Sequence, residues 1–273
     1  MELGDLIPFR EALRRNAVRE ALPTHLSTAE LQQIDAGILR SSFFSARNTL
    51  TTWLNSAKAK IERILNPTTE QRADRVTPEN PDGNVTTGLD PATARMELRD
   101  LITSLGYQPD PEKRGTIEDM SSDQRINLVI KTNREIAQGY GHWMQGQDAD
   151  VLDEWPASEL FRAESRKDER DWSVRWLAAA RESGDSDAVS AYGSSGRMVA
   201  LKDSPIWQAL GDGAGGFDSD ALHNPYPPFA FNSGMDVMDV TRDDAMDLGL
   251  IDRDTVVVPQ TQEFAANLPE EIA

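Results

Sequence analysis

The sequence predicts an α+β protein that is predominantly helical, with a small α+β region at the C-terminus containing a few short strands. Apolar residues recur at spacings of three and four over much of the chain before residue 184, a pattern typical of amphipathic helices. The two clearest strand signals, at 197–201 and 256–258, come late in the chain. They are accompanied by no internal repeat and no βαβ alternation, so a parallel α/β sheet is not expected.

The N-terminal part of the chain predicts a series of helices. A short amphipathic helix is expected over residues 8–22, and Pro23 follows it directly. The stretch 27–30, Ser-Thr-Ala-Glu, fits a capping box in which the serine and the glutamate satisfy each other's free amide groups. Residues 50–65 carry an apolar stripe that predicts a longer helix, which ends before Pro67.

The composition changes after this helix. Residues 67–89 are rich in Pro, Thr, Asn and Asp and contain almost no large apolar side chain, so they predict an exposed linker or long loop. Asp90 and Pro91 then offer an N-cap followed by a proline in the first turn of a helix. Gly106 provides a C-terminal stop for that helix.

The middle of the chain predicts two further helices. Ser121 or Ser122 can begin the first of them, and the glycines between 139 and 146 are expected to loosen its end. Residues 159–184 look helical by propensity, and two tryptophans in this stretch lie four positions apart, on one face.

The C-terminal part mixes strand and helix signals. Residues 197–201 can form a short strand, and a short helix is expected from 206 to its stop at Gly211. A capping signal at 241–244 predicts a helix through Leu248. Three consecutive valines at 256–258 give the strongest strand signal of the chain. The sequence is thus divided into an N-terminal helical region (1–66), a linker or long loop (67–89), a helical core (90–183) and an α+β C-terminal region with a Pro/aromatic loop (184–273).

The composition excludes several classes of protein. The chain has 273 residues, and its lack of cysteine excludes disulfides, thiolate metal sites and cysteine nucleophiles. No window approaches roughly 18 uninterrupted apolar residues, so no membrane span is expected. The formal net charge of −18 disfavours nucleic-acid binding, since affinity comes largely from neutralising phosphates. The N-terminal helix could bind nucleic acid weakly through a modest basic face, although a solvated helix surface explains its arginines better: Arg10, Arg14, Arg15 and Arg19.

No motif in the sequence predicts catalysis. Gly211, Gly213 and Gly216 have the spacing of a dinucleotide fingerprint, but a helix is expected before them and an acidic loop after them, so a flexible glycine loop explains them better. The three histidines are far apart, and the aspartates between 236 and 254 do not match a calcium-binding loop. The sequence therefore predicts no catalytic residue, no cofactor site and no metal ligand.

One segment carries more apolar surface than a loop usually does. It reads NPYPPFAFNSGMDVMDVTRDD and begins at Asn224. Proline fixes φ and removes amide donors, so this segment is expected to be stiff and extended. Its apolar side chains either pack on their own domain or form an ordered surface for assembly, and both can hold for different side chains. The candidate interface consists of Pro225, Tyr226, Pro227, Pro228, Phe229, Phe231 and Met235.

Several stretches of the chain resemble bacteriophage and prophage proteins related to the Mu F-like minor head, or head morphogenesis, family. They are SSFFSARNTL, LGYQPD, GTIEDMSSDQRINLVIKTNREIAQGYGHWMQGQD, PASELFRAESRKDERDWSVRW, GRMVALKDSPIW and NPYPPFAFNSGMDVMDVTRDDAMDLGLI. The resemblance covers roughly residues 40–250 apart from 67–89. Many members of that family end with a histidine-proline and cysteine-arginine-cysteine signature. This chain has no cysteine there, which places it in a divergent branch without a metal or thiol role.

The resemblance implies a structural, non-enzymatic protein in the phage head, and in the host cytoplasm during assembly. Its expected partners are the portal protein, the major capsid protein or both, and an oligomeric or multicopy assembly is compatible with that role. Two alternatives stay open. One is a metal-dependent hydrolase or toxin-like effector domain in residues 150–273, and the other is a transient scaffold or chaperone that binds capsid subunits.

Overall fold

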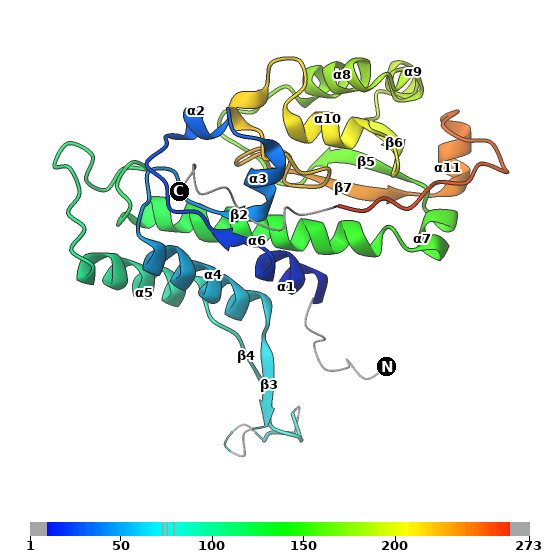
Figure 1. Cartoon of the computed structure of the whole chain (residues 1–273). Coiled ribbons are helices and arrows are strands. Elements are labelled where there is room, and N and C mark those ends of the chain that lie inside the picture. The colour runs from blue at the N-terminus through cyan, green and yellow to red at the C-terminus, as the bar shows by residue number, and fades with distance from the viewer. Residues whose placement is uncertain (1–9, 72–73, 75, 79, 263–273) are drawn as a thin grey trace. The chain divides into compact units, whose positions relative to one another are not determined.

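The computed structural model describes residues 10–71, 74, 76–78 and 80–262 and divides into two compact units (Figure 1). Of the described residues, those within 10–27 and 42–138 form unit 1, and those within 28–41 and 139–262 form unit 2. The described residues are mostly helical, with short strands in small sheets, which confirms the predicted fold class. Whether the four ranges distinguished in the sequence behave as separate domains stays a prediction.

Unit 1 is a helical unit. Its helices are α1 (Arg10–Ala17), α4 (Thr51–Leu65), α5 (Pro91–Ser104) and the N-terminal part of α6 (Asp123–Gln145). Short β1 (Glu20–Ala21) pairs in parallel with β2 (Ser42–Phe43). The expected helix starts are confirmed where the chain has caps: Asp90 accepts the amide of Thr93 at the start of α5, and Ser122 accepts the amide of Arg125 at the start of α6.

The core of unit 1 is mostly aliphatic and follows the predicted stripes. One face of α4 buries Trp53, Leu54, Ala57, Ile61 and Leu65 against α5 and α6. The indole Nε1 of Trp53 donates to the carbonyl of Leu98 at 3.0 Å, so the largest side chain of this core has no unpaired polar atom. The residues that α5 and α6 contribute to the same cluster are Ala94, Leu98, Ile102, Ile126, Val129, Ile130 and Ala137.

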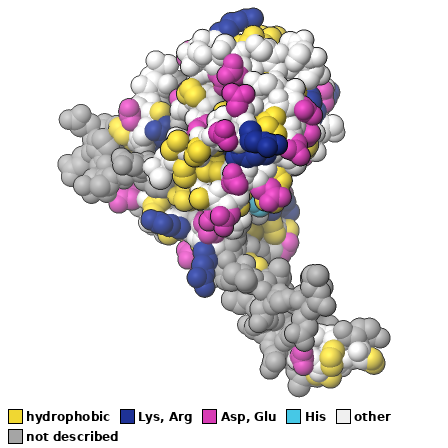
Figure 2. All heavy atoms as spheres, turned by 90° about the vertical axis from the view of Figure 1, so that its right-hand side faces the viewer, with side chains coloured by type: hydrophobic (Ala, Val, Ile, Leu, Met, Phe, Trp, Pro, Cys, Tyr) yellow, Lys and Arg dark blue, Asp and Glu magenta, His cyan; other side chains and the backbone are white. Residues whose placement is uncertain are grey.

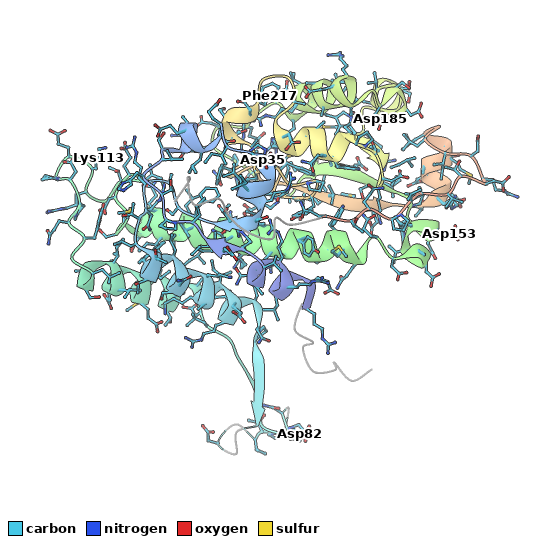
Figure 3. All side chains as sticks on the ribbon, viewed as in Figure 1. Asp35, Asp82, Lys113, Asp153, Asp185 and Phe217 are labelled. Atoms are coloured by element: carbon cyan, nitrogen blue, oxygen red, sulfur yellow. The ribbon has the colours of Figure 1, made fainter. Side chains whose placement is uncertain are left out.

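Residues 67–89, predicted as a linker or long loop, include two paired strands. β3 (Thr68–Gln71) and β4 (Asn84–Thr87) form an antiparallel hairpin in which Thr69 pairs with Thr86. The prediction rests on low apolar content and turn residues, whereas the strands are rich in threonine, whose branched side chain favours an extended backbone. The hairpin extends away from α4 and α5 in Figure 1, and Asp82 marks its far end in Figure 3. Residues 72–73, 75 and 79 lie outside the described part.

Unit 2 is built on a three-stranded antiparallel sheet with the order β6-β5-β7. The central strand β5 (Ala157–Arg162) pairs with β6 (Val199–Leu201) on one side and with β7 (Met235–Val240) on the other. Successive residues of β5 face opposite sides of the sheet. Leu160 therefore packs in one cluster with α8 and α10, while Ala157 packs in another with α9 and α11.

The helices of unit 2 come from both halves of the chain. They are α2 (Thr28–Leu31), α3 (Ala36–Ser41), the C-terminal part of α6, α7 (Ala149–Glu154), α8 (Trp172–Ser183), α9 (Ser186–Ser195), α10 (Ile206–Asp212) and α11 (Arg242–Asp247), together with the 3₁₀ turn η2 (Asp218–Asp220). Trp172 and Trp176 are both buried on one face of α8, as their spacing predicts. Thr241 caps α11 by accepting the amide of Asp244, which confirms that helix start.

Four expectations about local structure are wrong. Residues 159–162, expected to be helical, belong to strand β5, because pairing with β6 and β7 stabilises the extended backbone more than helix propensity favours the helix. Residues 18–22 are not part of the helix expected over 8–22, because α1 ends at Ala17 and Glu20–Ala21 pair as β1. Residues 256–258, expected as a strand, form none. Residues 235–240, which belong to the segment 224–244 expected to be a loop (the Pro/aromatic segment), form strand β7. The valine triplet pairs with no strand of the described chain, and both Val256 and Val258 are exposed.

Among the described residues, no helix is long and apolar enough to span a membrane.

Candidate functional site

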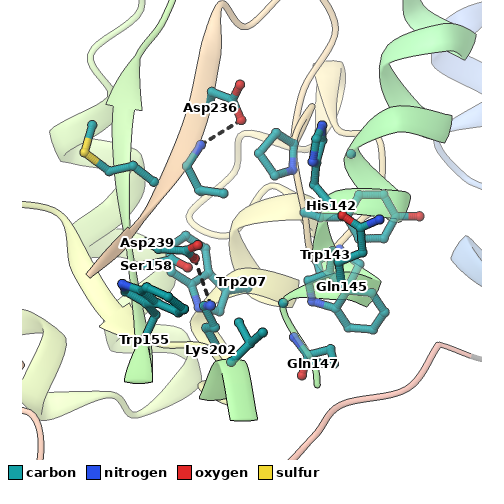
Figure 4. Close-up of a pocket in the computed structure, with 18 of the residues that line it drawn as sticks. His142, Trp143, Gln145, Gln147, Trp155, Ser158, Lys202, Trp207, Asp236 and Asp239 are labelled. Carbon is teal, nitrogen blue, oxygen red and sulfur yellow. Dashed lines mark hydrogen bonds and ion pairs between the residues drawn. The ribbon is translucent and has the colours of Figure 1, made fainter. Parts of the chain in front are cut away.

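Unit 2 contains a cavity of about 550 Å³, shown in close-up in Figure 4. Its walls come from the C-terminal end of α6 and the turn that follows, from the Pro/aromatic segment, and from one edge of the sheet. This volume lies in the range of sites that hold small ligands or single side chains of a partner. Its aromatic lining consists of Trp143, Trp155, Trp207, Tyr226 and Phe229.

Two elements far apart in sequence form one wall because a glycine lets them meet. A Cβ at Gly139 would lie 1.7 Å from the carbonyl oxygen of Pro227, so only glycine fits at this position of α6. The neighbouring Tyr226 ring packs edge-on against Tyr140 at 5.7 Å and at a tilt against Trp143 at 5.6 Å between ring centroids. Its hydroxyl donates to Oε1 of Gln262 at 2.9 Å.

A second glycine contact fixes the start of the same segment. A Cβ at Gly211 in α10 would lie 1.9 Å from the carbonyl oxygen of Asn224, and the amide of His223 donates to the Gly211 carbonyl at 2.9 Å. In the same wall, the Trp207 ring stacks on Phe229 with centroids 6.0 Å apart, and its Nε1 donates to the carbonyl of Leu201. The back of the cavity is therefore rigidly packed.

The sheet contributes the charged groups of the cavity. Lys202, which follows β6, reaches across the sheet so that its Nζ lies 2.8 Å from Oδ1 of Asp239 on β7. The lysine side chain is only 6% exposed, while that of Asp239 is 56% exposed. The contact is an ion pair, and the buried ammonium has no hydrogen-bond partner among the described residues. Ser158 of β5 also lines this floor.

The structure separates the predicted interface residues into two groups. Tyr226, Phe229 and Met235 are buried in unit 2, and Pro227 and Pro228 are buried with them. These side chains pack within unit 2, as one of the two alternatives expects, and the role of the segment as an interface stays a prediction. The segment carries apolar surface because two glycines let it fold back as core. The two members that keep accessible surface are half-buried, Pro225 and Phe231.

The basic face expected near the N-terminus is smaller than its four arginines suggest. Arg10 and Arg14 of α1 are exposed, but Arg15 and Arg19 are buried in unit 1. The Arg19 Nε donates to the carbonyl of Ser42 at 2.8 Å, and its guanidinium lies 5.3 Å from the ring centre of Phe43. Arg19 therefore stabilises the packing of this unit. Of the four arginines, only Arg10 and Arg14 present their charge to solvent.

The remaining sequence candidates do not converge. His25 and His142 are exposed. Among the described residues, no group of three or more His, Asp or Glu could hold a metal ion. Gly213 and Gly216 follow helix α10 with positive φ, and a Cβ at Gly213 would lie 2.5 Å from the amide of Asp218, so this loop is a turn. The late aspartates all face solvent, namely Asp236, Asp239, Asp243, Asp244, Asp247, Asp252 and Asp254.

His223 instead holds a segment from the first part of the chain. Its Nδ1 lies 3.0 Å from Oδ1 of Asp212, and its Nε2 lies 3.1 Å from Oε1 of Gln32. The Gln32 amide donates to the carbonyl of Ala221, which orients its oxygen toward the imidazole. Arg40 donates to the carbonyl of His223 at 3.1 Å. This histidine therefore has a structural role in fastening residues 28–41 to unit 2.

A charge cluster stabilises another part of unit 2. Arg175 forms two hydrogen bonds with the carboxylate of Asp220, at 2.8 and 3.0 Å, and Arg170 binds the same group. Burial alone raises the pKa of Asp220, but the two guanidinium groups outweigh it and hold that pKa below its ordinary value. The Arg175 guanidinium also lies 4.6 Å from the ring centre of Phe217. Internal partners account for the charges of this cluster, so it is structural.

Sequence reasoning misses most of the cavity. Lys202 follows a predicted strand, but nothing in the sequence shows that its side chain turns inward. Trp143 and Trp155 can be recognised, because each lies beside a helix end, near Gly146 and Pro156. Helix ends that carry tryptophan beside glycine or proline are a usable signal for such walls.

Comparisons of the chain with models of protein families, with curated proteins and with solved structures find no match in any of the three. The fold and the cavity define the class: a predominantly helical α+β protein with an aromatic cavity at the edge of a small antiparallel sheet. The resemblance to phage head morphogenesis proteins stays a prediction.

Proposed function

We propose that this chain is a structural minor head protein of a phage or prophage, which binds portal or capsid components during procapsid assembly. Two things support the proposal: the resemblance of six stretches between residues 40 and 250 to head morphogenesis proteins, and the form of unit 1. The observation that carries it is the β3–β4 hairpin.

The hairpin is a two-stranded element that projects from the helices of unit 1. At its base the amide of Leu89 donates to the carbonyl of Arg63 at 3.3 Å. Beyond that point, the strands pair with each other, and Thr77 and Asn80 exchange backbone hydrogen bonds near the turn. An isolated two-stranded hairpin is marginally stable at best in water, and Val76 near its end is 55% exposed. A partner surface that covers the hairpin would supply the missing burial.

The enzymatic alternative has less support. A metal-dependent hydrolase needs carboxylates or histidines that converge on one pocket. The aspartates of residues 236–254 are spread over exposed positions of β7, α11 and the following turn instead. Glu159, the half-buried acidic group of β5, is held by Arg197 at 2.6 Å, which is the arrangement of a structural ion pair.

The test uses a variant in which residues 70–85 are replaced by Asn-Gly, a two-residue turn that keeps the pairs formed by Thr68 and Thr69. The full chain and the variant are each co-expressed with candidate portal and capsid proteins, and procapsids and mature particles are analysed by quantitative mass spectrometry. We expect a few copies of the full chain per particle and at least a ten-fold loss for the variant.

The control is Met96→Ser, which changes an exposed apolar residue of α5 away from the hairpin. It should incorporate like the unchanged chain. Presence in procapsids alone would identify a transient scaffold. Absence of the unchanged chain from both kinds of particle would overturn the proposal. If the hairpin variant is incorporated as well as the unchanged chain, the hairpin is not the part that binds the head component.

A further inference from the structure

The two charges at the floor of the cavity cancel each other. Asp239 lies opposite Ser158 in the sheet, and its carboxylate pairs with the ammonium of Lys202. Asp236 lies three positions earlier on β7 and therefore faces the other side of the sheet. Its carboxylate is exposed and accepts the amide of Val237 at 2.8 Å. A ligand on the floor therefore meets an ion pair without net charge.

The ammonium of Lys202 has hydrogen-bond donors to offer. Its side chain is only 6% exposed, and its buried Nζ has no hydrogen-bond partner among the described residues. An ammonium carries three N–H donors, and leaving them unpaired away from water costs free energy. A ligand oxygen that accepts from this nitrogen would recover that cost. His142 also lines the cavity, but it is exposed, so water screens any charge that it carries.

The walls beside this ammonium are aromatic. Trp143 and Trp155 are half-buried and keep part of their surface toward solvent. In the view of Figure 4, they lie on opposite sides of the Lys202–Asp239 pair. A flat ring that enters the cavity can therefore pack on an indole, by stacking or edge-on, while a polar substituent of the ring reaches the ammonium.

The surface outside the cavity does not decide which ligands bind. Figure 2 shows acidic side chains interspersed with basic and apolar ones on one face of the molecule. Salt screens such exposed charges over about 10 Å at roughly 0.1 M ionic strength. Buried groups are screened much less, so the chemistry inside the cavity selects the ligand.

We propose that this cavity binds a neutral small molecule that combines an aromatic ring with a carbonyl oxygen, such as an aromatic carboxamide. The ring lies against Trp143 or Trp155, and the oxygen accepts from the Nζ of Lys202. A cation is disfavoured because the buried ammonium repels it. An anion is disfavoured because it would compete with Asp239 for the same ammonium. The inference goes beyond the proposed function and rests on the cavity alone.

The first experiment titrates the full chain with benzamide, benzoate and benzamidinium at neutral pH and follows the indole N–H signals by ¹H–¹⁵N NMR. These probes share a ring and nearly a shape, but the first is neutral, the second negative and the third positive. We expect saturable binding of benzamide with a Kd of about 1–10 mM, because a ligand of this size buries little surface, and binding of the charged probes weaker by about five-fold or more. Trp143→Phe and Trp155→Phe assign the responding signals.

Two substitutions should change the preferred probe in opposite directions. Lys202→Met removes the ammonium and nearly keeps the length of the side chain, so the carboxylate of Asp239 should make benzamidinium bind tighter than benzamide. Asp239→Asn leaves the ammonium without its counter-ion, so benzoate should bind tighter than benzamide. A thermal melt checks that each variant folds. The control Asp254→Asn removes an equal charge from an exposed turn of the same unit and should leave the order of the probes unchanged.

The inference would be overturned if either charged probe bound the unchanged chain as tightly as benzamide, or if no probe bound saturably. Folded Lys202→Met that still preferred benzamide would also overturn it, because the oxygen would then not contact the ammonium. If a variant does not fold, the order of the probes on the unchanged chain decides. The hairpin test is independent. If the cavity rejects benzamide while the hairpin variant fails to assemble, this inference falls and the proposed function stands.

Discussion

Residues 67–89 and residues 224–235 of the Pro/aromatic segment both have the turn residues of loops, but the first form a projecting hairpin and the second are largely buried. Residues 67–89 have the composition of a linker, yet they contain paired strands that project from a helical unit. Residues 224–235 have the composition of a stiff segment that either packs on its own domain or serves assembly, and Tyr226, Phe229 and Met235 are buried in unit 2. Apolar content alone does not locate a contact surface, because what matters is whether the rest of the chain can approach closely enough to cover it.

The largest effect in this comparison is expected at Phe229. Phe229 is 0% exposed and stacks on Trp207, so Phe229→Ala is expected to lower the free energy of unfolding by about 3–5 kcal/mol. Phe231→Ala, at the half-buried neighbour two positions on, should cost clearly less. Urea denaturation followed by tryptophan fluorescence measures both. Similar small losses for the two variants would show that the segment is not core.

Two glycine substitutions sharpen the argument about close approach. Gly139→Ala places a methyl group on the carbonyl of Pro227 and should destabilise by about 3 kcal/mol, the upper end of ordinary overpacking. Gly193→Ala in α9 meets nothing within 4 Å and should stabilise by about 0.5–1 kcal/mol, because alanine is the better helix former. Thermal unfolding of both variants checks the opposite signs. The same sign for both would contradict the geometry.

The Asp220 cluster gives a pH-dependent prediction. The pKa of Asp220 lies below the ordinary value of 3.8, so its pair with Arg175 and Arg170 contributes stability above that value and loses it as pH falls through the lowered pKa. Asp220→Asn should cost about 2 kcal/mol at neutral pH, and the difference should vanish in strongly acidic solution. Asp218→Asn, on a neighbour in the same turn, is the control. Denaturation curves at neutral pH and below the ordinary pKa measure the difference; a loss independent of pH would exclude the ion pair as its cause.

The smallest effect is expected for the hairpin. Replacing residues 70–85 by Asn-Gly should change the free energy of unfolding by less than about 1 kcal/mol, because the buried core cluster of unit 1 is formed by α1, β2, α4, α5 and α6. Circular dichroism during heating measures this change. A loss as large as that of Phe229→Ala would mean that the hairpin belongs to the core of unit 1.

The sequence predicts unit 1 better than unit 2 for a physical reason. The stripe of α4 and the caps of α5 and α6 are local, so spacing and cap residues are enough to place them. The residues of β5 have the propensity of a helix. They form a strand because they pair with β6 and β7, which lie about 40 and 80 positions later, and local propensity carries no information about such distant partners.

The cavity is hardest to predict, because each of its walls depends on contacts between distant segments. The pair of Lys202 and Asp239 exists only because β6 and β7 flank the same strand. The close approach of Gly139 and Pro227 depends on two residues that no local pattern connects. Glycine inside an otherwise regular helix is the available signal, but taken alone it indicates a helix end as readily as a close contact.

The attachment of residues 28–41 has a consequence for synthesis of the protein. Gln32 donates to the carbonyl of Ala221, which lies 189 positions later. At roughly 5–20 residues per second, about 10–40 seconds pass on the ribosome before this partner emerges. Leu31 and Leu39, both buried in the finished protein, must stay exposed for that time. The nascent chain therefore offers a chaperone an apolar segment until the residues around Ala221 have emerged.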